Sequence, residues 1–285
     1  MHLYEYLIGV GAMKAGTTLL YDLLRKHPGF LCGQHKELHY FDQVDQPDKG
    51  EYDALFAPGQ GVKLDVTPIY MYDPQCIRKI CQVLDPAQVA VAVVLRDPVE
   101  RALSHWRMCL SQAQEKHSFE ACFDLEPQRI AQNAHDKKTY SYFSRGLYVP
   151  QLDNLYQHFP AENIRIFIFE DFVKNQQRCV DSLCDFVGLP RFQVREGHSN
   201  KTVVQVKSPA LARFMRAMAR VTPNRFKRNW MRKAKYLLAR ANEKKAPRES
   251  IAPAFEQRLI DYYRQDVALL KSQYHLDLSA WKRFG

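Results

Sequence analysis

Long apolar runs and export signals are missing from this chain. None of its apolar stretches reaches the ~18 residues that a membrane-spanning helix needs. The first residues, Met1-His2-Leu3-Tyr4-Glu5, have neither the basic start nor the apolar stretch of a signal peptide. On this basis the sequence predicts a cytoplasmic protein; the alternative is a luminal domain cut from a membrane-anchored parent, which would look similar.

Paired cysteines are also missing. The seven cysteines are an odd number, and no two of them stand as Cys-x-x-Cys. This pattern favours neither a disulfide framework nor a zinc site, so we expect reduced cysteines that pack as small apolar side chains. No cluster of ligand side chains indicates another metal, and the sequence predicts none.

Acidic residues are scarce in one segment, residues 207–248. The chain has a formal net charge of +10, and this segment holds 14 of the 41 Lys and Arg residues but only one acidic residue, Glu243. Its apolar residues recur at helical spacing between arginines, which predicts a basic amphipathic helix. Such a helix packs on a core, docks an anionic acceptor, or lies peripherally on an anionic membrane surface.

Apolar strands alternate with amphipathic helices along most of the chain, which predicts an α/β fold with a central parallel sheet flanked by helices. The unbroken apolar run Val89–Leu95 is typical of a parallel strand covered on both faces. The predicted strands are 4–10, 89–95 and 164–169, and the predicted helices are 17–26, one from about 98, 149–159 and 175–187. We expect a single domain, 1–285, with a nucleotide-binding core at 1–205 and a helical, basic C-terminal part at 206–285. The last part contains predicted helices at 209–221, 226–242 and 252–273.

A glycine-containing turn joins the first strand to the first helix. It reads Gly11-Ala12-Met13-Lys14-Ala15-Gly16-Thr17-Thr18. Backbone N–H groups at such a turn and the positive end of the helix attract an anion. The two glycines have the spacing of an ATP-binding P-loop, but Thr17 occupies the lysine position and Lys14 precedes the second glycine. The turn therefore predicts a phosphate site without the ATPase arrangement, unless it is a purely structural turn.

A second candidate phosphate site follows the strand at 89–95. Arg96 stands at its carboxyl end, where open α/β sheets bind ligands, and Ser104 lies eight residues further on, in the next helix. An arginine fork and a serine hydroxyl together suit a phosphate. The alternative is that Arg96 pairs with Asp97 or Glu100 and that Ser104 faces solvent.

These two stretches resemble the 5'-phosphosulfate loop and the R-D-P-x-x-R-x-x-S motif of sulfotransferases that use 3'-phosphoadenosine 5'-phosphosulfate (PAPS). In style the chain is closest to the bacterial and heparan-sulfate or other carbohydrate enzymes. The resemblance implies a P-loop-like three-layer fold, with PAPS as donor and PAP as product. It implies that Lys14, Ala15, Gly16, Thr17 and Thr18 bind the 5' end, and that Arg96 and Ser104 bind the 3'-phosphate.

The segment Lys36-Glu37-Leu38-His39-Tyr40-Phe41 resembles the K-E-x-H-[FY]-F segment of the heparan-sulfate type. The resemblance implies that Glu37 is the base that takes the acceptor's proton, with His39 as its assistant or as the base itself. Residues 64–70 resemble the family's E-K-T-P-x-Y segment. Val66 stands there in place of a lysine, which argues against a heparan-type acceptor.

Two weaker resemblances add three candidate residues. Ser144-Arg145-Gly146-Leu147-Tyr148 resembles the family's G-x-Y turn, which places Arg145 and Tyr148 near the substrates. Ser199-Asn200-Lys201-Thr202 resembles an N-K-[ST] element that closes over the nucleotide, which makes Lys201 a donor-binding candidate.

The sequence thus predicts in-line sulfuryl transfer from PAPS to a hydroxyl or amine of a glycan, glycolipid or other metabolite. We expect no magnesium requirement, because the transferred group carries less negative charge than a phosphoryl group. The alternatives are a P-loop nucleotide kinase and a non-enzymatic polyanion binder that uses residues 207–248. The displaced lysine and the lack of an identifiable Walker B partner argue against the kinase. The polyanion binder explains the basic segment but not the two phosphate motifs, and no nucleic-acid partner is expected.

Overall fold

The computed structural model describes residues 3–195, 204–206, 243–245 and 251–285. It divides into two compact units. Unit 1 comprises Met1–Arg101, Arg145–Ser199 and Leu259–Gly285, and unit 2 comprises Ala102–Ser144 and Asn200–Arg258. Helices α5 (Pro98–Ser111) and α13 (Pro253–Ser272) each belong partly to both units.

Unit 1 is built on a five-stranded sheet in which all strand pairs are parallel, in the order β2-β3-β1-β4-β5. Every residue of β1 and β4 is buried. The strands are β1 (Tyr6–Gly11), β2 (Phe30–Cys32), β3 (Val62–Val66), β4 (Val89–Leu95) and β5 (Ile164–Ile168). The three predicted strands are confirmed, whereas β2 and β3 were not predicted.

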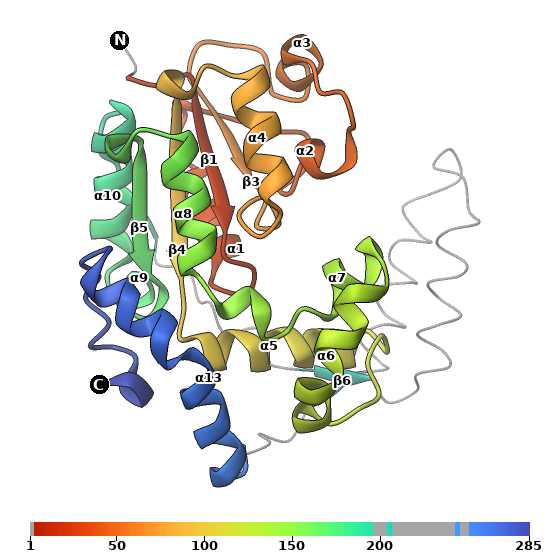
Figure 1. The fold of residues 1–285 in the computed structure, drawn as a ribbon. Helices are drawn as coiled ribbons and strands as arrows, with labels where there is room; N and C mark the ends of the chain where they lie inside the picture. Colours follow the sequence, from red (N-terminus) through yellow and green to blue (C-terminus); the bar gives the residue numbers. More distant parts are fainter. Residues whose placement is uncertain (1–2, 196–203, 207–242, 246–250) are drawn as a thin grey trace. The chain divides into compact units, whose positions relative to one another are not determined.

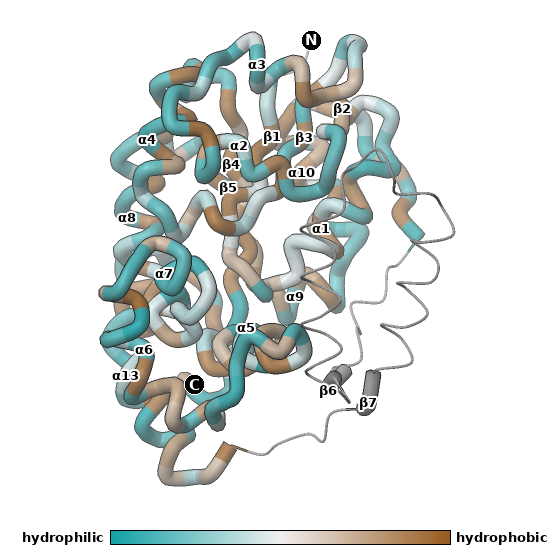
Figure 2. The backbone as a smooth tube through the Cα atoms, turned by 90° about the vertical axis from the view of Figure 1, so that its right-hand side faces the viewer, coloured by the Kyte–Doolittle hydropathy of each residue, from teal (hydrophilic) through white to brown (hydrophobic). Residues whose placement is uncertain are grey.

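Helices cover both faces of this sheet, as Figures 1 and 2 show: α4 and α8 lie on one face, and α1 and α10 on the other. The main helices are α1 (Thr17–Leu24), α4 (Pro74–Val83), α8 (Val149–His158), α9 (Phe169–Lys174) and α10 (Gln176–Val187). Two short helices, α2 (Tyr40–Gln43) and α3 (Lys49–Asp53), precede β3. The predicted three-layer α/β architecture is confirmed.

The strand order locates the place where a ligand binds in such a sheet. From β1 the chain continues to β2 and β3 on one side, and from β4 it continues to β5 on the other. The connections therefore diverge between β1 and β4, and open α/β sheets bind their ligands beyond the carboxyl ends of the strands at such a point. Residues 11–18 and Arg96 lie at these two strand ends.

Unit 2 contains α6 (Phe119–Gln132), α7 (Ala134–Tyr140) and an antiparallel pair, β6 (Val204–Val206) with β7 (Glu243–Lys245). The rings of Phe119, Phe123, Phe143 and Phe255 pack against one another in its core. The helix predicted at 252–273 is confirmed as α13, while those at 209–221 and 226–242 lie outside the described residues. Within the predicted helical part 206–285, the segment β7 between two of the predicted helices is a strand that pairs with β6.

Candidate functional site

The turn between β1 and α1 has the geometry of an anion cradle. Gly16 is the N-cap residue of α1 with φ 88°, and as a glycine it supplies no side-chain cap to this helix end. A Cβ atom on Gly16 would lie 2.6 Å from the Phe169 ring, so the position requires glycine for its space as well as its conformation. Thr17 is the first helical residue and is 5% exposed. Uncapped amides at a helix start bind anions.

Arg96 leaves the end of β4 and reaches this turn. Its Nη1 donates a hydrogen bond to the Lys14 carbonyl at 3.2 Å, and its guanidinium lies 4.9 Å from the centre of the Phe169 ring. Its Nη2 is 3.5 Å from Glu100, and its buried Nε has no hydrogen-bond partner among the described residues. The two predicted phosphate motifs are therefore in direct contact, and Arg96 retains donor capacity for an anion.

Arg145 and Tyr148 support the same region from the chain segment before α8. Arg145 is 2% exposed, donates from Nη1 to the Met13 sulfur at 2.9 Å, and stacks 4.4 Å from the Tyr72 ring centre. Tyr148 is completely buried, and its hydroxyl donates to the Arg96 carbonyl at 2.8 Å. These contacts give both residues positioning roles beside Met13 and Arg96. Direct contact with an acceptor stays a prediction.

Glu37 and His39 form a charged cluster with two neighbours. His39 Nε2 lies 3.5 Å from a Glu37 oxygen, and its Nδ1 lies 3.0 Å from Asp42. Glu37 also pairs with Lys36. The side chains of Glu37 and His39 are 39% and 35% exposed, so both can be reached from solvent.

The contacts of this cluster separate the pKa values of the two candidate bases. The His39 bond, assisted by Lys36, lowers the pKa of Glu37 to about 2 against the opposing effect of burial. Asp42 first, and Glu37 second, raise the pKa of His39 to about 9. At neutral pH, Glu37 is a carboxylate that can accept a proton, while His39 is protonated and can only donate.

Thr67 connects this cluster to the first strand. Its amide donates to the Gly9 carbonyl at 3.0 Å, while its hydroxyl accepts from the Leu38 amide at 3.0 Å and donates to Asp65 at 2.6 Å. Burial raises the pKa of Asp65 to about 6, against hydrogen bonds from Thr67 and two tyrosines. The backbone between Glu37 and His39 is thus tied to the strand that carries the phosphate turn.

The contacts of two further predicted donor-binding residues with this turn are not established. Ser104 is on α5, in the part that belongs to unit 2. Lys201 and most of the basic segment 207–248 lie outside the described residues. The roles of Ser104 and Lys201 stay predictions.

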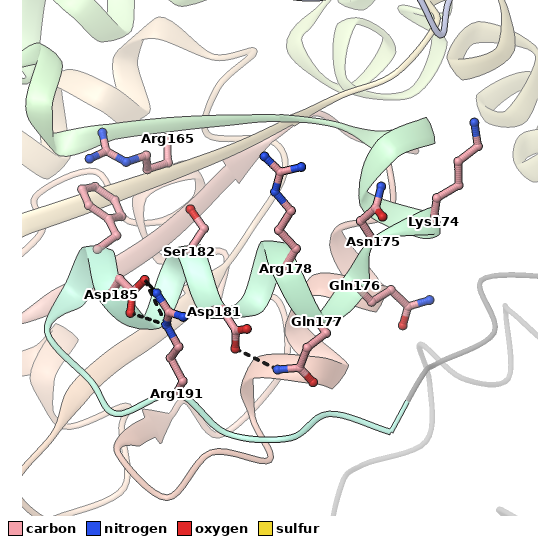
Figure 3. A pocket seen from close by; sticks show the side chains of 11 residues that line it. Arg165, Lys174, Asn175, Gln176, Gln177, Arg178, Asp181, Ser182, Asp185 and Arg191 are labelled. Atoms are coloured by element: carbon pink, nitrogen blue, oxygen red, sulfur yellow. Dashed lines mark hydrogen bonds and ion pairs between the residues drawn. The ribbon is translucent and has the colours of Figure 1, made fainter.

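A polar groove of about 780 Å³ runs along α10 in unit 1 (Figure 3). Four cations and two carboxylates line it, but Arg191 pairs with Asp185 at 2.6 Å and Gln177 bonds to Asp181 at 2.8 Å. Figure 3 shows Arg178 and Ser182 on one side of α10, with Gln177 and Asp181 on the other. None of the predicted phosphate or base residues lines this groove, so we do not assign the chemistry to it.

Sequence reasoning missed several residues of the site around β1 and β4. Phe169 forms the wall beside Gly16 and Arg96, and Asp42 fixes the charge of His39. Asp42 stands three residues after His39, at the start of a short helix. In a helix this spacing brings two side chains together, so the pair was predictable from the sequence. Phe169 is the last residue of the third predicted strand, and no local motif links it to a turn more than 150 residues earlier.

The described ranges hold neither a metal-binding cluster nor a membrane-spanning helix. No group of three or more His, Cys, Asp or Glu side chains is placed to hold a metal ion there. Likewise, none of the helices in that part of the chain combines the length and apolarity needed to cross a bilayer.

The known proteins that this chain resembles in sequence and in fold are sulfotransferases. The family model described as "Sulfotransferase domain" matches residues 73–269, a range that includes Arg96 and Ser104 but begins after the phosphate turn. Heparan sulfate glucosamine 3-O-sulfotransferase 6 of Homo sapiens is 30% identical over 188 residues, 64% of this chain and 52% of that protein. Heparan sulfate glucosamine 3-O-sulfotransferase 3A1 of Homo sapiens is 26% identical over 185 residues, 64% of this chain and 44% of that protein.

The chain therefore spans about half the length of these curated relatives. Among solved structures, a sulfotransferase from Alicyclobacillus acidocaldarius superposes with a TM-score of 0.70 at 22% identity, covering 97% of this chain and 98% of that one. At this identity the likeness shows a shared fold. The resemblance read from the two phosphate motifs is confirmed at the level of the family.

Proposed function

Because the chain belongs to the sulfotransferase domain family, we propose that it transfers a sulfuryl group from PAPS to a glycan acceptor. One observation carries this proposal above the others. The hydrogen bond from Arg96 to the Lys14 carbonyl joins a candidate 3'-phosphate residue to a candidate 5'-phosphate turn. PAPS has phosphates at these two positions, whereas ATP and ADP carry all of theirs on the 5' side.

The residues at the strand ends fit such a donor. Gly16 adds no side chain at the start of α1, and the buried Nε of Arg96 has no partner among the described residues. When bound, PAPS supplies the sulfuryl group and leaves as PAP. We assign the 5'-phosphate to the amides of residues 15–18 with the Thr17 and Thr18 hydroxyls, and the 3'-phosphate to Arg96 and Ser104.

Lys14 is our candidate for stabilising negative charge on the leaving side. It stands within the turn at φ 72°, a conformation that few residues other than glycine adopt. Its ammonium group can balance charge on the bridging and sulfonate oxygens as the bond to the leaving phosphate breaks. Lys201 is retained as a second donor-binding candidate.

Glu37 is our candidate for the base. Its pKa of about 2 keeps it ionised at neutral pH, so it can take the acceptor's proton as the new bond to sulfur forms. His39, with a pKa of about 9, holds a positive charge next to it and orients its carboxylate. The contacts of His39 with Glu37 and Asp42 favour this division of roles over a histidine base.

The acceptor class is drawn from the relatives and the cluster around Glu37. The matched curated proteins are named for heparan sulfate, which supports a glycan acceptor. Val66 is completely buried, in place of the lysine of many heparan-sulfate enzymes, and so supplies no charge for a sulfated substrate. We therefore propose a glycan whose recognition differs from that of heparan sulfate. Glycolipids and small metabolites belong in the same acceptor screen.

The first experiment is calorimetric titration with 3',5'-ADP (PAP), 5'-AMP, 5'-ADP and ATP in the absence of magnesium. We expect clear preference for 3',5'-ADP, and we expect Arg96→Ala to remove it. Arg191→Ala, which removes an exposed arginine from the groove on α10, is the matched control. Equal binding of all four nucleotides, or none, would refute PAPS use, and magnesium-dependent ATP turnover would point instead to a kinase.

The acceptor is then identified with ³⁵S-labelled PAPS and a panel of glycans, glycolipids and small hydroxyl or amine compounds. Label on a glycan supports the proposal, while label only on another class corrects the acceptor and leaves the reaction intact. The single-domain organisation, the cytoplasmic location and the membrane contact through residues 207–248 stay predictions.

A further inference from the structure

The C-terminal residues of the chain contact the motif that contains Arg96. After α13 the chain ends in a 3₁₀ turn, η5 (Lys282–Phe284), that follows Trp281. Trp281 is completely buried, and its Nε1 donates to Glu170 at 3.0 Å. The other oxygen of Glu170 accepts from the Asp97 amide at 3.4 Å. The final turn is thus anchored beside the residue that follows Arg96.

Arg283, within this final turn, forms two ion pairs with the same motif. Its Nη1 lies 3.3 Å from Asp97, and its Nη2 lies 3.1 Å from one oxygen of Glu100. The other oxygen of Glu100 is 3.5 Å from Nη2 of Arg96. Glu100 is therefore shared between two arginines, and the pair with Arg283 is the shorter one.

This sharing determines how much of the Arg96 charge is left for a ligand. Three carboxylates, those of Asp97, Glu100 and Glu170, surround the start of α5, and Arg96 is in contact with Glu100. Without Arg283, Glu100 would have Arg96 as its remaining arginine and would draw the guanidinium towards itself. That movement would pull Arg96 away from the Lys14 carbonyl and the Phe169 ring, and its charge would be neutralised by the protein rather than by a phosphate.

We propose that Arg283 is a positioning residue for donor binding: it holds Asp97 and Glu100, and so leaves the Arg96 guanidinium available to the 3'-phosphate. This inference rests on the proposed function. Arg283 acts through Arg96 and does not itself touch the nucleotide. The buried Trp281 fixes the turn in which Arg283 lies.

The test compares binding of 3',5'-ADP with that of 5'-AMP, which differs from it only by the 3'-phosphate. We expect Arg283→Ala to weaken 3',5'-ADP binding by roughly three- to tenfold, the range typical of partly exposed charge networks, and to leave 5'-AMP binding within about twofold. Arg283→Lys keeps a positive charge and should recover most of the affinity. Arg264→Ala, which removes an exposed arginine on α13 paired with Asp261, is the matched control and should change neither ligand.

Two further variants test the route of the effect. In an Arg96→Ala background, Arg283→Ala should have no further effect on 3',5'-ADP binding. In a Glu100→Gln background its effect should shrink, because the competing carboxylate is gone. If circular dichroism shows that Arg283→Ala does not fold, Glu100→Gln alone carries the test. It should tighten 3',5'-ADP binding about twofold or more, and weaker or unchanged binding would overturn the proposal.

The outcomes separate this inference from the proposed function. If the wild-type protein does not prefer 3',5'-ADP, the proposed function itself fails. If the wild type prefers it and Arg96→Ala abolishes that preference, equal weakening of both ligands by Arg283→Ala would mark a purely structural role. No weakening of 3',5'-ADP binding in that variant would likewise overturn the positioning role alone.

Discussion

Replacing Glu37 with glutamine tests which member of the charged cluster takes the acceptor's proton. The substitution keeps the size of the side chain and its contact with His39 but removes the carboxylate. Loss of a general base typically slows turnover by about 10²–10⁴-fold. We expect Glu37→Gln to lose turnover within this range while its affinity for 3',5'-ADP stays near the wild-type value.

Because the pKa values of Glu37 and His39 are far apart, the pH dependence of the rate distinguishes a Glu37 base from a His39 base. With a pKa of about 9, only about 1% of His39 is neutral at pH 7, so a histidine base would gain rate almost tenfold per pH unit up to that value. Glu37, with a pKa of about 2, is fully ionised throughout this range. A Glu37 base therefore gives kcat/KM that is level between about pH 5 and 8, then falls near 9 as His39 loses its proton.

Two measurements check this expectation. The first is the profile of kcat/KM against pH with the acceptor found in the screen, for the wild type, Glu37→Gln and His39→Gln. The second is NMR titration of the His39 imidazole, assigned with His39→Gln, which needs no acceptor. The midpoint should lie near 9 in the wild type and fall in Glu37→Gln. It should fall further in Asp42→Asn, because Asp42 makes the larger contribution.

A rate that rises steadily from pH 6 to 9 in the wild type, together with full activity of Glu37→Gln, would refute the assignment and make His39 the base. A His39 midpoint near its ordinary value of 6.5 would show that the cluster does not hold in solution as described.

Four further predictions concern two residues of the turn, a buried carboxylate and metal dependence. Lys14→Ala should lower turnover by about 10²–10³-fold in the ³⁵S assay, and near-wild-type turnover would remove Lys14 from the mechanism. Gly16→Ala should lower the free energy of unfolding, measured in urea, by about 1–3 kcal/mol and should weaken 3',5'-ADP binding. The added Cβ would clash with the Phe169 ring, and φ 88° is unfavourable for alanine. An unchanged free energy of unfolding and an unchanged affinity would contradict the geometry of the turn. Burial raises the pKa of Asp65 from 3.8 to about 6, because the folded protein favours the protonated carboxyl group. The stability that this preference gives is complete below about pH 4 and is lost as the pH rises through 6. Asp65→Asn should remove about 3 kcal/mol of this change in the free energy of unfolding with pH. If urea unfolding at several pH values shows the same pH dependence in the wild type and in Asp65→Asn, the prediction is wrong. EDTA should leave sulfuryl transfer unchanged, because the transferred group carries little charge for a metal to offset, and a loss restored by magnesium would refute this.

The parts of the fold that the sequence predicted are those with strong local patterns. The apolar run Val89–Leu95 is buried on both faces, and its boundaries match β4 residue for residue. The helix at 98 begins with a proline, as expected for a first helical turn. By contrast, β2 has three residues, and β3 includes Lys63 and the buried Asp65, so neither shows the continuous apolar pattern of β4. Their pairing with β1 is a tertiary effect that local pattern does not reveal.

The candidate site divides in the same way. Lys14, Arg96 and Glu37 stand in contiguous motifs, so their types and order were readable without a structure. Their supports were not readable, because Phe169 and Arg283 approach from segments far along the chain. The burial of Tyr148 and its bond to Arg96 also depend on packing around α8 that no short motif specifies.

The bond between Arg96 and the Lys14 carbonyl thermodynamically links the two ends of the donor site that we propose. A ligand that fixes Arg96 through a 3'-phosphate also fixes the backbone of the turn that receives the 5' end, and by reciprocity the filled turn favours the same position of the arginine. A nucleotide without the 3' group meets a turn whose neighbouring arginine is unconstrained. If the proposed donor site is right, discrimination against ATP, which competes for any 5'-phosphate site in a cell, arises from cooperation between these two modest contacts.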